Sequence, residues 1–268
     1  MILILFFLLK DSLRFFQKVT LGEFLFGEKW YPISTPPKFG ILPLIIGTFL
    51  VTITATVISV PLGVGCAVYI AEIANPRIKE YLKIIVELIA GIPSVVLGFI
   101  GLLILAPAAR EILNLPTGLT AFTGAVILAF MAIPTIATIS EDAINSVPRD
   151  YREAAMALGA SRWQTISKIL VPAAFSGILA AILLGIGRVI GETMVVMMVC
   201  GNASAIPKSI FQPVRTMTAT IAAEMGETVQ GSLHYEALFA IGLFLFIISF
   251  CINFLADLAI RRKGFKSR

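Results

Sequence analysis

Two charged residues interrupt an otherwise apolar stretch of the chain, and their side chains are of the kind that binds an anion. Arg188 and Glu192 lie within residues 183–196, where the other residues are Gly, Leu, Ile, Val and Met apart from Thr193. Arg188 follows Pro172 by 16 residues, or about 24 Å along a helix. If this stretch crosses a membrane, a charge at that depth costs about 2.5–3.5 kcal/mol and normally faces a bundle interior or a water-filled path. We therefore expect Arg188 to mark the path of a solute.

The guanidinium of Arg188 can offer an oxyanion two parallel hydrogen bonds in one plane. Glu192 follows Arg188 by one helical turn. A carboxylate that follows its basic partner stabilises a helix less than one that precedes it. Glu192 would hold Arg188 while the path is empty and prevent the anion from binding too tightly, and Thr193 would add a hydroxyl donor. Gly187 and Gly191 bracket Arg188 at a spacing that lets a neighbouring backbone approach closely. The alternative is a buried ion pair that only fixes the rotation of the helix.

The composition indicates which elements must position these residues. Of the 268 residues, 58% are hydrophobic and 14% are charged, whereas an average soluble domain has about 25% charged residues. Long apolar runs between short charged intervals predict an all-α integral membrane protein. The net charge is +5, and the basic residues are scattered through the loops without forming a stripe. They therefore indicate membrane topology and not nucleic-acid binding. Because the cysteines and the single histidine fit no metal-ligand spacing and no nucleotide-binding motif is present, we expect no catalytic residue and no metal site.

Five apolar stretches are long enough to cross a membrane as helices. We expect these spans at 43–71, 84–106, 119–139, 172–200 and 237–260, and a short helix near 216–226. Residues 1–9 are apolar but too few to cross a hydrocarbon core that needs about 20. Pro61 with Gly63, and Gly91 with Pro93, interrupt two of the spans. We expect kinks at these positions, and the alternative is unwound backbone that lines a path.

The longest polar interval between two apolar stretches, residues 148–172, has the pattern of two short helices. We expect one over 150–158 and another over 161–170, with Gly159 in a left-handed conformation between them. The expected capping boxes are Asp150 with Glu153 and Ser161 with Gln164. One interpretation is an ordinary helical hairpin between spans, and the other is a docking surface.

Small residues on one face favour the docking surface. Ala154, Ala155 and Leu158 share a face on which another surface can approach closely. The sequence resembles the EAA signature of ABC importer permeases, with Val171 where Leu is usual, in Glu153-Ala154-Ala155, Gly159 and Ile169-Leu170-Val171-Pro172. In that family the loop lies in the cytoplasm and inserts into a groove of the ATP-hydrolysing subunit. The resemblance therefore implies that the coupling residues are Glu153, Ala154, Ala155 and Gly159.

A narrower resemblance points to one branch of that family. The segment Gly185–Asn202 is similar to the corresponding segment of phosphate-specific permeases of the PstC type, as are Ile92–Gly98 and Glu28–Pro32. The resemblance implies a six-helix type I ABC importer permease (MetI-like) fold. It also implies a second permease of the PstA type, two cytoplasmic ATPases that bind ATP and Mg, an external phosphate-binding protein, and phosphate as the solute. No cofactor is expected in this chain itself.

The resemblance also sets the expected organisation and topology. We expect an N-terminal part over 1–42, comprising a first span whose beginning is missing and an external segment, and a permease core over 43–264. A cytoplasmic coupling loop is expected at 141–171 and a basic cytoplasmic tail at 265–268, because the positive-inside rule favours this side for the loop and the C-terminus. The protein would thus be a multi-pass subunit of the cytoplasmic membrane. Alternatives are a permease for sulfate, molybdate or an amino acid, and a passive channel or membrane scaffold.

Overall fold

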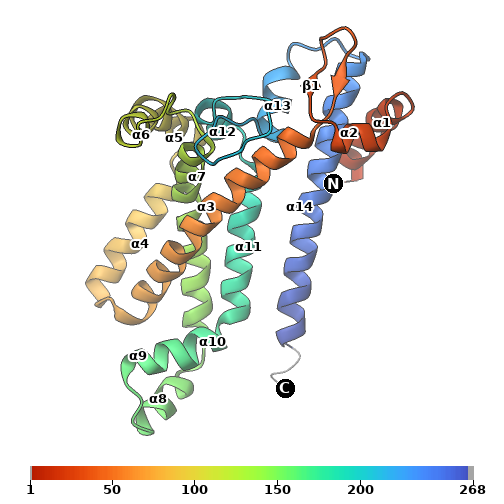
Figure 1. Cartoon of the computed structure of the whole chain (residues 1–268). Helices are drawn as coiled ribbons and strands as arrows, with labels where there is room; N and C mark the ends of the chain where they lie inside the picture. Colours follow the sequence, from red (N-terminus) through yellow and green to blue (C-terminus); the bar gives the residue numbers. More distant parts are fainter. Residues whose placement is uncertain (1, 265–268) are drawn as a thin grey trace. The chain divides into compact units, whose positions relative to one another are not determined.

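The computed structural model describes residues 2–264, with side chains for residues 5–254, and it is mostly helical (Figure 1). The chain divides into two compact units, which are described separately. The first unit comprises Met1–Ala55, Pro93–Leu128 and Ile190–Phe250, and the second comprises Thr56–Ile92, Ala129–Val189 and Cys251–Arg268. The expected basic tail at 265–268 lies outside the described residues.

Four long helices contribute residues to both units: α3 (Leu42–Val68), α7 (Ala121–Asn145), α11 (Phe175–Gly191) and α14 (Leu233–Gly264). The first unit also contains α1 (Ile2–Phe16), α2 (Leu21–Phe26), β1 (Trp30–Tyr31), β2 (Lys38–Phe39), α5 (Ser94–Ile100), the π-helix η2 (Gly101–Leu105), α6 (Ala106–Ile112), α12 (Met194–Val199) and α13 (Met217–Glu224). The second unit also contains the π-helix η1 (Tyr69–Ile73), α4 (Pro76–Ala90), α8 (Arg149–Ala157), α9 (Arg162–Thr165), the π-helix η3 (Ile166–Leu170) and α10 (Val171–Ala173).

An aromatic core and one carboxylate hold the β1–β2 hairpin in the first unit. Trp30 is 2% exposed, and its ring lies edge-on to that of Phe39 at 6.1 Å. The carboxylate of Glu224 accepts hydrogen bonds from Trp30 Nε1 at 3.0 Å and from Arg215 Nη1 at 2.7 Å, and it lies 2.8 Å from His234 Nε2. Since this carboxylate joins the hairpin to α13 and α14, the single histidine has a structural partner.

Most of the expected membrane spans agree with the helices. Among the described residues, four helices are long and apolar enough to cross a membrane: Leu42–Ile73, Ser94–Ile112, Ala121–Asn145 and Leu233–Phe254. A fifth candidate is the pair Arg162–Ala173 and Phe175–Gly191, bent by 70°. The all-α membrane class is therefore confirmed, and the described part of the chain contains up to five of the six expected spans. In the expected N-terminal part over 1–42, α1 has 15 residues, fewer than the roughly 20 that a membrane span needs.

Two of the predicted spans have the wrong boundaries. The span expected at 84–106 is broken, since α4 ends at Ala90 and α5 begins at Ser94 after an extended Pro93. A proline ring disfavours helical backbone in the residue before it, so the helix stops before Pro93. The kink expected at Gly91 and Pro93 is therefore wrong, because the backbone is interrupted there. Pro61, by contrast, lies inside the unbroken α3, so the backbone there is not unwound. The span expected at 172–200 is also interrupted, because α11 runs only from Phe175 to Gly191.

Candidate functional site

Arg188 lies near the end of α11, well away from its beginning. The bend before Phe175 shortens the expected distance, because Arg188 is 13 residues after the first residue of α11, or about 20 Å. This is less than the 24 Å expected from a helix that starts at Pro172. It still exceeds the reach of an arginine side chain, so the guanidinium of Arg188 cannot extend to the beginning of α11.

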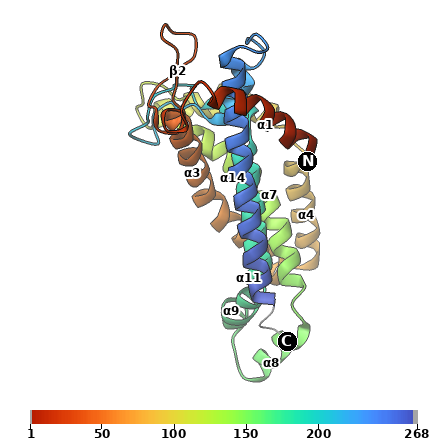
Figure 2. The ribbon, with the colours of Figure 1, turned by 90° about the vertical axis from the view of Figure 1, so that its right-hand side faces the viewer.

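Close helix packing in the second unit sets the surroundings of Arg188. Ile136 of α7, which is 1% exposed, lies against Gly63 of α3 and Gly185 of α11. A Cβ atom at Gly63 would lie 2.8 Å from Ile136, and one at Gly185 would lie 2.7 Å from it. The two glycines therefore let α3 and α11 approach α7 at one point. Figure 2 shows α7 and α11 running alongside each other.

This packing is expected to be sensitive to volume at Gly185 but not at Gly187, where a Cβ atom would meet nothing within 4 Å. Replacing Gly185 with Val should destabilise the chain by about 1–3 kcal/mol, since an added side chain must displace the buried Ile136. Gly187→Val, two residues later on the same helix, is the matched control and should change the free energy of unfolding by less than about 0.5 kcal/mol. Thermal unfolding in detergent measures both. Equal losses for the two variants would contradict the packing argument.

The same packing places a hydroxyl beside Arg188. Arg188 is exposed in this chain, and its Nη1 donates a hydrogen bond of 3.0 Å to Oγ1 of Thr135, the residue before Ile136. Sequence reasoning missed Thr135, although a hydroxyl beside Pro134 in an apolar helix was a visible signal. One nitrogen of the guanidinium is thereby held by α7. The arrangement can orient the remaining N–H groups of Arg188 towards an anion.

Glu192 and Thr193 lie in a break between helices and not on the same helix as Arg188. Because α11 ends at Gly191, the continuous helix expected through residues 188–192 is wrong. Glu192 Oε1 accepts hydrogen bonds from the backbone N–H groups of Met194 at 3.1 Å and Val195 at 3.4 Å. The carboxylate thus caps the N-terminus of α12, where a negative charge is favourable.

The hydroxyl of Thr193 donates to the backbone oxygen of Gly191 at 3.3 Å. Glu192 belongs to the first unit and Arg188 to the second, so the pairing of these two side chains stays a prediction, as does the role of Thr193. A Cβ atom at Gly187 or Gly191 would meet nothing within 4 Å. The close approach expected at these glycines is therefore not made by a described residue of this chain.

The second candidate site is the pair of short helices α8 and α9, which we call the α8–α9 hairpin (Arg149–Thr165). α7 continues to Asn145, so the expected loop at 141–171 begins later than predicted. The capping box of Ser161 with Gln164 is confirmed, and Gly159 has the expected left-handed backbone with φ +80°. The box expected at Asp150 is wrong, because α8 begins at Arg149 after Pro148 and has no side-chain cap. A proline at this position already fixes the start of the helix.

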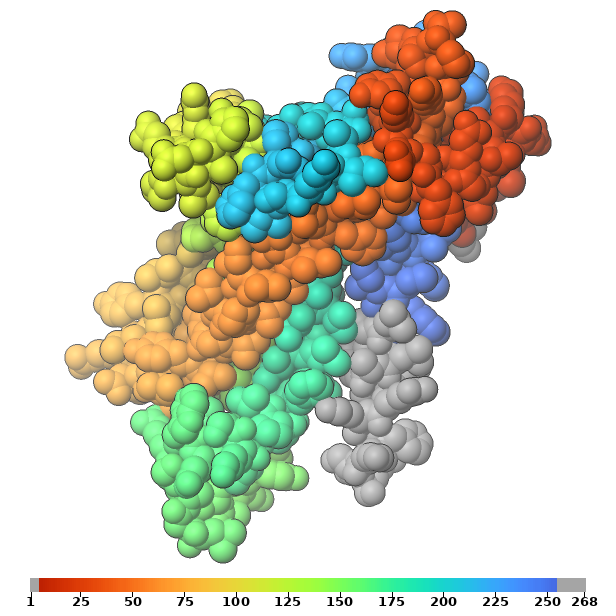
Figure 3. Space-filling model, in the orientation of Figure 1, coloured from red at the N-terminus to blue at the C-terminus, as the bar shows by residue number. Residues whose placement is uncertain are grey.

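The outer face of the hairpin exposes large apolar side chains. In the space-filling view the two helices form one lobe (Figure 3). Leu158 is 89% exposed and Trp163 is 66% exposed. Tyr151 and Met156 are exposed on the same hairpin, and sequence reasoning missed Tyr151, Met156 and Trp163 as candidate contacts. Exposed apolar groups gathered in this way indicate an interaction surface.

The residues expected to couple the hairpin to a partner divide between its two faces. Glu153, Ala154 and Gly159 are exposed, so their positions suit direct contact with another protein. Ala155 is 4% exposed and faces inward. Its part in coupling stays a prediction, and it would act through the packing of α8. Successive side chains point in different directions around a helix axis, so Ala154 can be exposed while the adjacent Ala155 faces inward.

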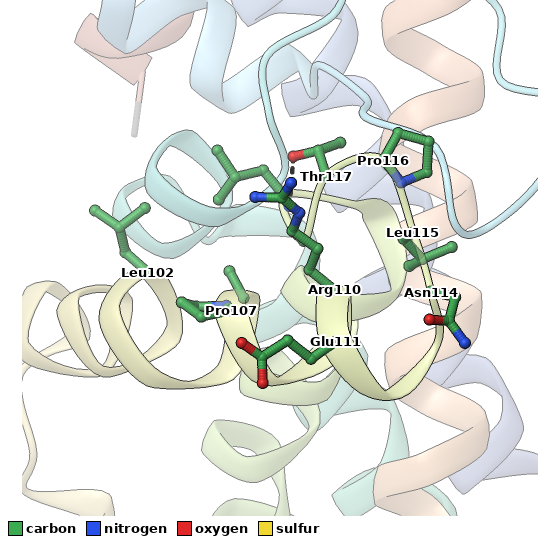
Figure 4. A pocket seen from close by; sticks show the side chains of 11 residues that line it. Leu102, Pro107, Arg110, Glu111, Asn114, Leu115, Pro116 and Thr117 are labelled. Carbon is green, nitrogen blue, oxygen red and sulfur yellow. Dashed lines mark hydrogen bonds between the residues drawn. The ribbon is translucent and has the colours of Figure 1, made fainter.

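Other hollows lie in the first unit. Figure 4 shows a pocket of about 730 Å³ beside α6 that is lined by Leu102, Pro107, Arg110, Glu111, Asn114, Leu115, Pro116 and Thr117, among others. A second hollow of about 850 Å³ includes Trp30, Arg215, Glu224 and His234. Across the described residues, no group of three His, Cys, Asp or Glu side chains could hold a metal ion. Neither hollow gathers the residues expected for the solute path.

Sequence comparison relates most of this chain to transport proteins. Residues 59–264 match the family described as binding-protein-dependent transport system inner membrane component. The probable ABC transporter permease protein YqgH of Bacillus subtilis is 44% identical over 242 residues, covering 90% of this chain and 78% of that protein. The phosphate transport system permease protein PstC of Mesorhizobium japonicum is 36% identical over 259 residues, with coverage of 90% and 78%.

Solved structures share the fold at lower sequence identity. A chain of the bacterial alginate ABC transporter, in complex with its alginate-bound periplasmic protein, aligns with a TM-score of 0.66 and 18% identity, covering 95% of this chain and 87% of that one. A chain of the inward-facing MetNI methionine ABC transporter aligns with a TM-score of 0.60 and 23% identity, covering 83% and 94%. These matches confirm the expected type of permease fold. The chain therefore belongs to the family of inner membrane components of binding-protein-dependent transport systems, as a multi-pass permease subunit of an ABC importer.

Proposed function

We propose that this permease subunit imports inorganic phosphate. The observation that carries the proposal is Arg188, an exposed guanidinium in the last turn of an apolar helix whose position is fixed from α7 by Thr135. The likeness to permeases named for phosphate transport supports the choice of solute. Arg188 accounts for an oxyanion as the solute, and the likeness accounts for phosphate in particular.

Arg188 offers the passing anion paired hydrogen bonds, and Thr135 keeps the guanidinium aimed while no anion is present. A bond to a neutral hydroxyl is weaker than an ion pair, so the anion can displace it and later leave. Glu192 and Thr193 line the path near the break after α11, where Glu192 limits the affinity by repulsion. A path must bind its solute weakly enough to release it.

The α8–α9 hairpin lies in the cytoplasm and docks to an ATPase through Glu153, Ala154, Gly159 and the exposed apolar side chains around them. The C-terminus lies on the same side. The complete importer contains a second permease of the PstA type, two ATPases that bind ATP and Mg, and an external phosphate-binding protein. Solved relatives include transporters with a bound periplasmic protein, which supports this assembly. ATP binding moves the hairpin, and the spans open the path alternately to each side.

Uptake by the reconstituted complex tests the solute. We expect ATP-dependent accumulation of labelled phosphate, with sulfate and molybdate taken up at least about tenfold more slowly under the same conditions. Faster uptake of sulfate, molybdate or an amino acid would replace phosphate as the solute. Solute flux that is indifferent to nucleotide would instead support a passive channel, the alternative from another functional class.

A further inference from the structure

Glu72 lies where both helices of the α8–α9 hairpin meet the end of α3. It belongs to η1, the π-helix that continues α3, and its side chain is 7% exposed. Arg152 of α8 forms an ion pair with the Glu72 carboxylate, and Arg162 of α9 donates a hydrogen bond to the Glu72 backbone oxygen. These contacts join residues 80 and 90 positions apart in the sequence. Each helix of the hairpin is therefore attached to the same residue.

An apolar cluster continues this attachment inside the second unit. Ala67 near the end of α3 packs with Ile144 of α7, and with Ile166 and Leu170 of η3, which follows the hairpin. These four side chains are 0–3% exposed. Because packed interiors have low compressibility, this cluster holds η3 in place against the ends of α3 and α7.

The direct link between the hairpin and η1 consists mainly of the two arginine contacts. A cavity of about 320 Å³ opens beside Glu72, Arg152 and Arg162, so apolar packing does not fill this junction. The Nε atom of Arg152 is buried, and the described residues give it no hydrogen-bond partner. Removing one partner of such a partly desolvated pair leaves the other charge without compensation. The junction should therefore depend strongly on the Glu72 carboxylate.

The most exposed part of the docking face lies apart from the junction. Arg152 and Glu72 pair beside the cavity, which Met156 also lines, whereas Leu158 and Trp163 are exposed and do not line it. π-helical turns inside α-helices frequently lie at functional sites. η1 stands between the hairpin and the span α3.

We propose that Glu72 is a positioning residue that transmits the movement of the α8–α9 hairpin to α3. This inference rests on the proposed function, because it assumes that an ATPase moves the hairpin. Glu72 touches neither the solute nor the ATPase. It acts through Arg152 and Arg162, so its loss uncouples ATP hydrolysis from transport and leaves docking intact.

The test compares single and paired variants in the reconstituted importer, with ATP consumed per phosphate imported as the readout. Glu72→Gln and Arg152→Gln should each raise that ratio by about fivefold or more, because each leaves an unpaired group at the junction. The reversed pair, Glu72→Arg with Arg152→Glu, should return the ratio to within about twofold of the native value, as coupled residues do in a double-mutant cycle. Glu80→Gln and Arg77→Gln are matched controls, since both side chains are exposed on α4, the helix that follows η1.

Retention of the ATPase during purification separates this inference from the proposed function. We expect every variant to retain the ATPase as the native chain does. A purely structural role for the pair would instead lower the amount of assembled complex in Glu72→Gln and leave the ATP-to-phosphate ratio of the remaining complex unchanged. A native ratio in Glu72→Gln, or a reversed pair that stays uncoupled, would overturn the inference while phosphate import by the native complex stands. A native chain that captures no ATPase would overturn both.

Discussion

Replacing Arg188 with Gln is expected to lower phosphate uptake by about a hundredfold while the importer still assembles. The guanidinium can give an oxyanion two charge-assisted hydrogen bonds, each contributing about 1.5–3 kcal/mol. Losing both costs at least about 3 kcal/mol, and each 1.4 kcal/mol is a factor of about ten. Labelled phosphate uptake in proteoliposomes measures the loss, and co-purification of the other subunits measures assembly.

Two variants show whether this loss comes from the path. Thr135→Val removes the hydroxyl that accepts the 3.0 Å bond from Arg188 but keeps the shape of the side chain. It should lower uptake by only about fivefold to tenfold, since a neutral partner contributes about 1 kcal/mol. Arg77→Gln removes an exposed arginine of α4 in the second unit and should leave uptake unchanged. Normal uptake by Arg188→Gln would show that Arg188 has only a structural role.

Replacing Gly159 with Asp is expected to abolish capture of the ATPase, with at least about a hundredfold loss of affinity. Gly159 has φ +80°, and a Cβ atom there would meet nothing within 4 Å. The new side chain therefore projects from the hairpin beside Leu158, which is 89% exposed. A carboxylate next to Leu158 on a docked apolar face would be buried without a partner, which is costly. Pull-down of the ATPase with tagged permease measures the effect.

Gly159→Asn is the matched control for Gly159→Asp, because the Asn side chain has nearly the same shape as that of Asp but carries no charge. Both residues tolerate a left-handed backbone better than other side chains do, so the conformational cost is similar and about 1 kcal/mol. Gly159→Asn should retain most of the capture, and the thermal stability of both variants should be alike. Full capture and transport by Gly159→Asp would show that the hairpin does not dock through this face.

Local sequence patterns predicted those features that depend on nearby residues. The capping box of Ser161 with Gln164 and the left-handed Gly159 follow from short-range backbone chemistry, and both are confirmed. The box at Asp150 failed because Pro148 starts the helix earlier. The breaks after Ala90 and Gly191 were missed because apolar residues continue on both sides, so hydropathy alone cannot show where backbone hydrogen bonding stops.

The sequence by itself determined the membrane class, most of the spans and the presence of a charge deep in one of them. Composition and periodicity carry this information, because lipid requires long apolar helices. Only the tertiary structure decided the partners of the charges. Thr135 lies beside Arg188 because Ile136 packs against Gly185, and Glu72 meets two arginines of the α8–α9 hairpin. Such pairs lie 53 to 90 positions apart, and helix packing, which no local pattern encodes, brings them together.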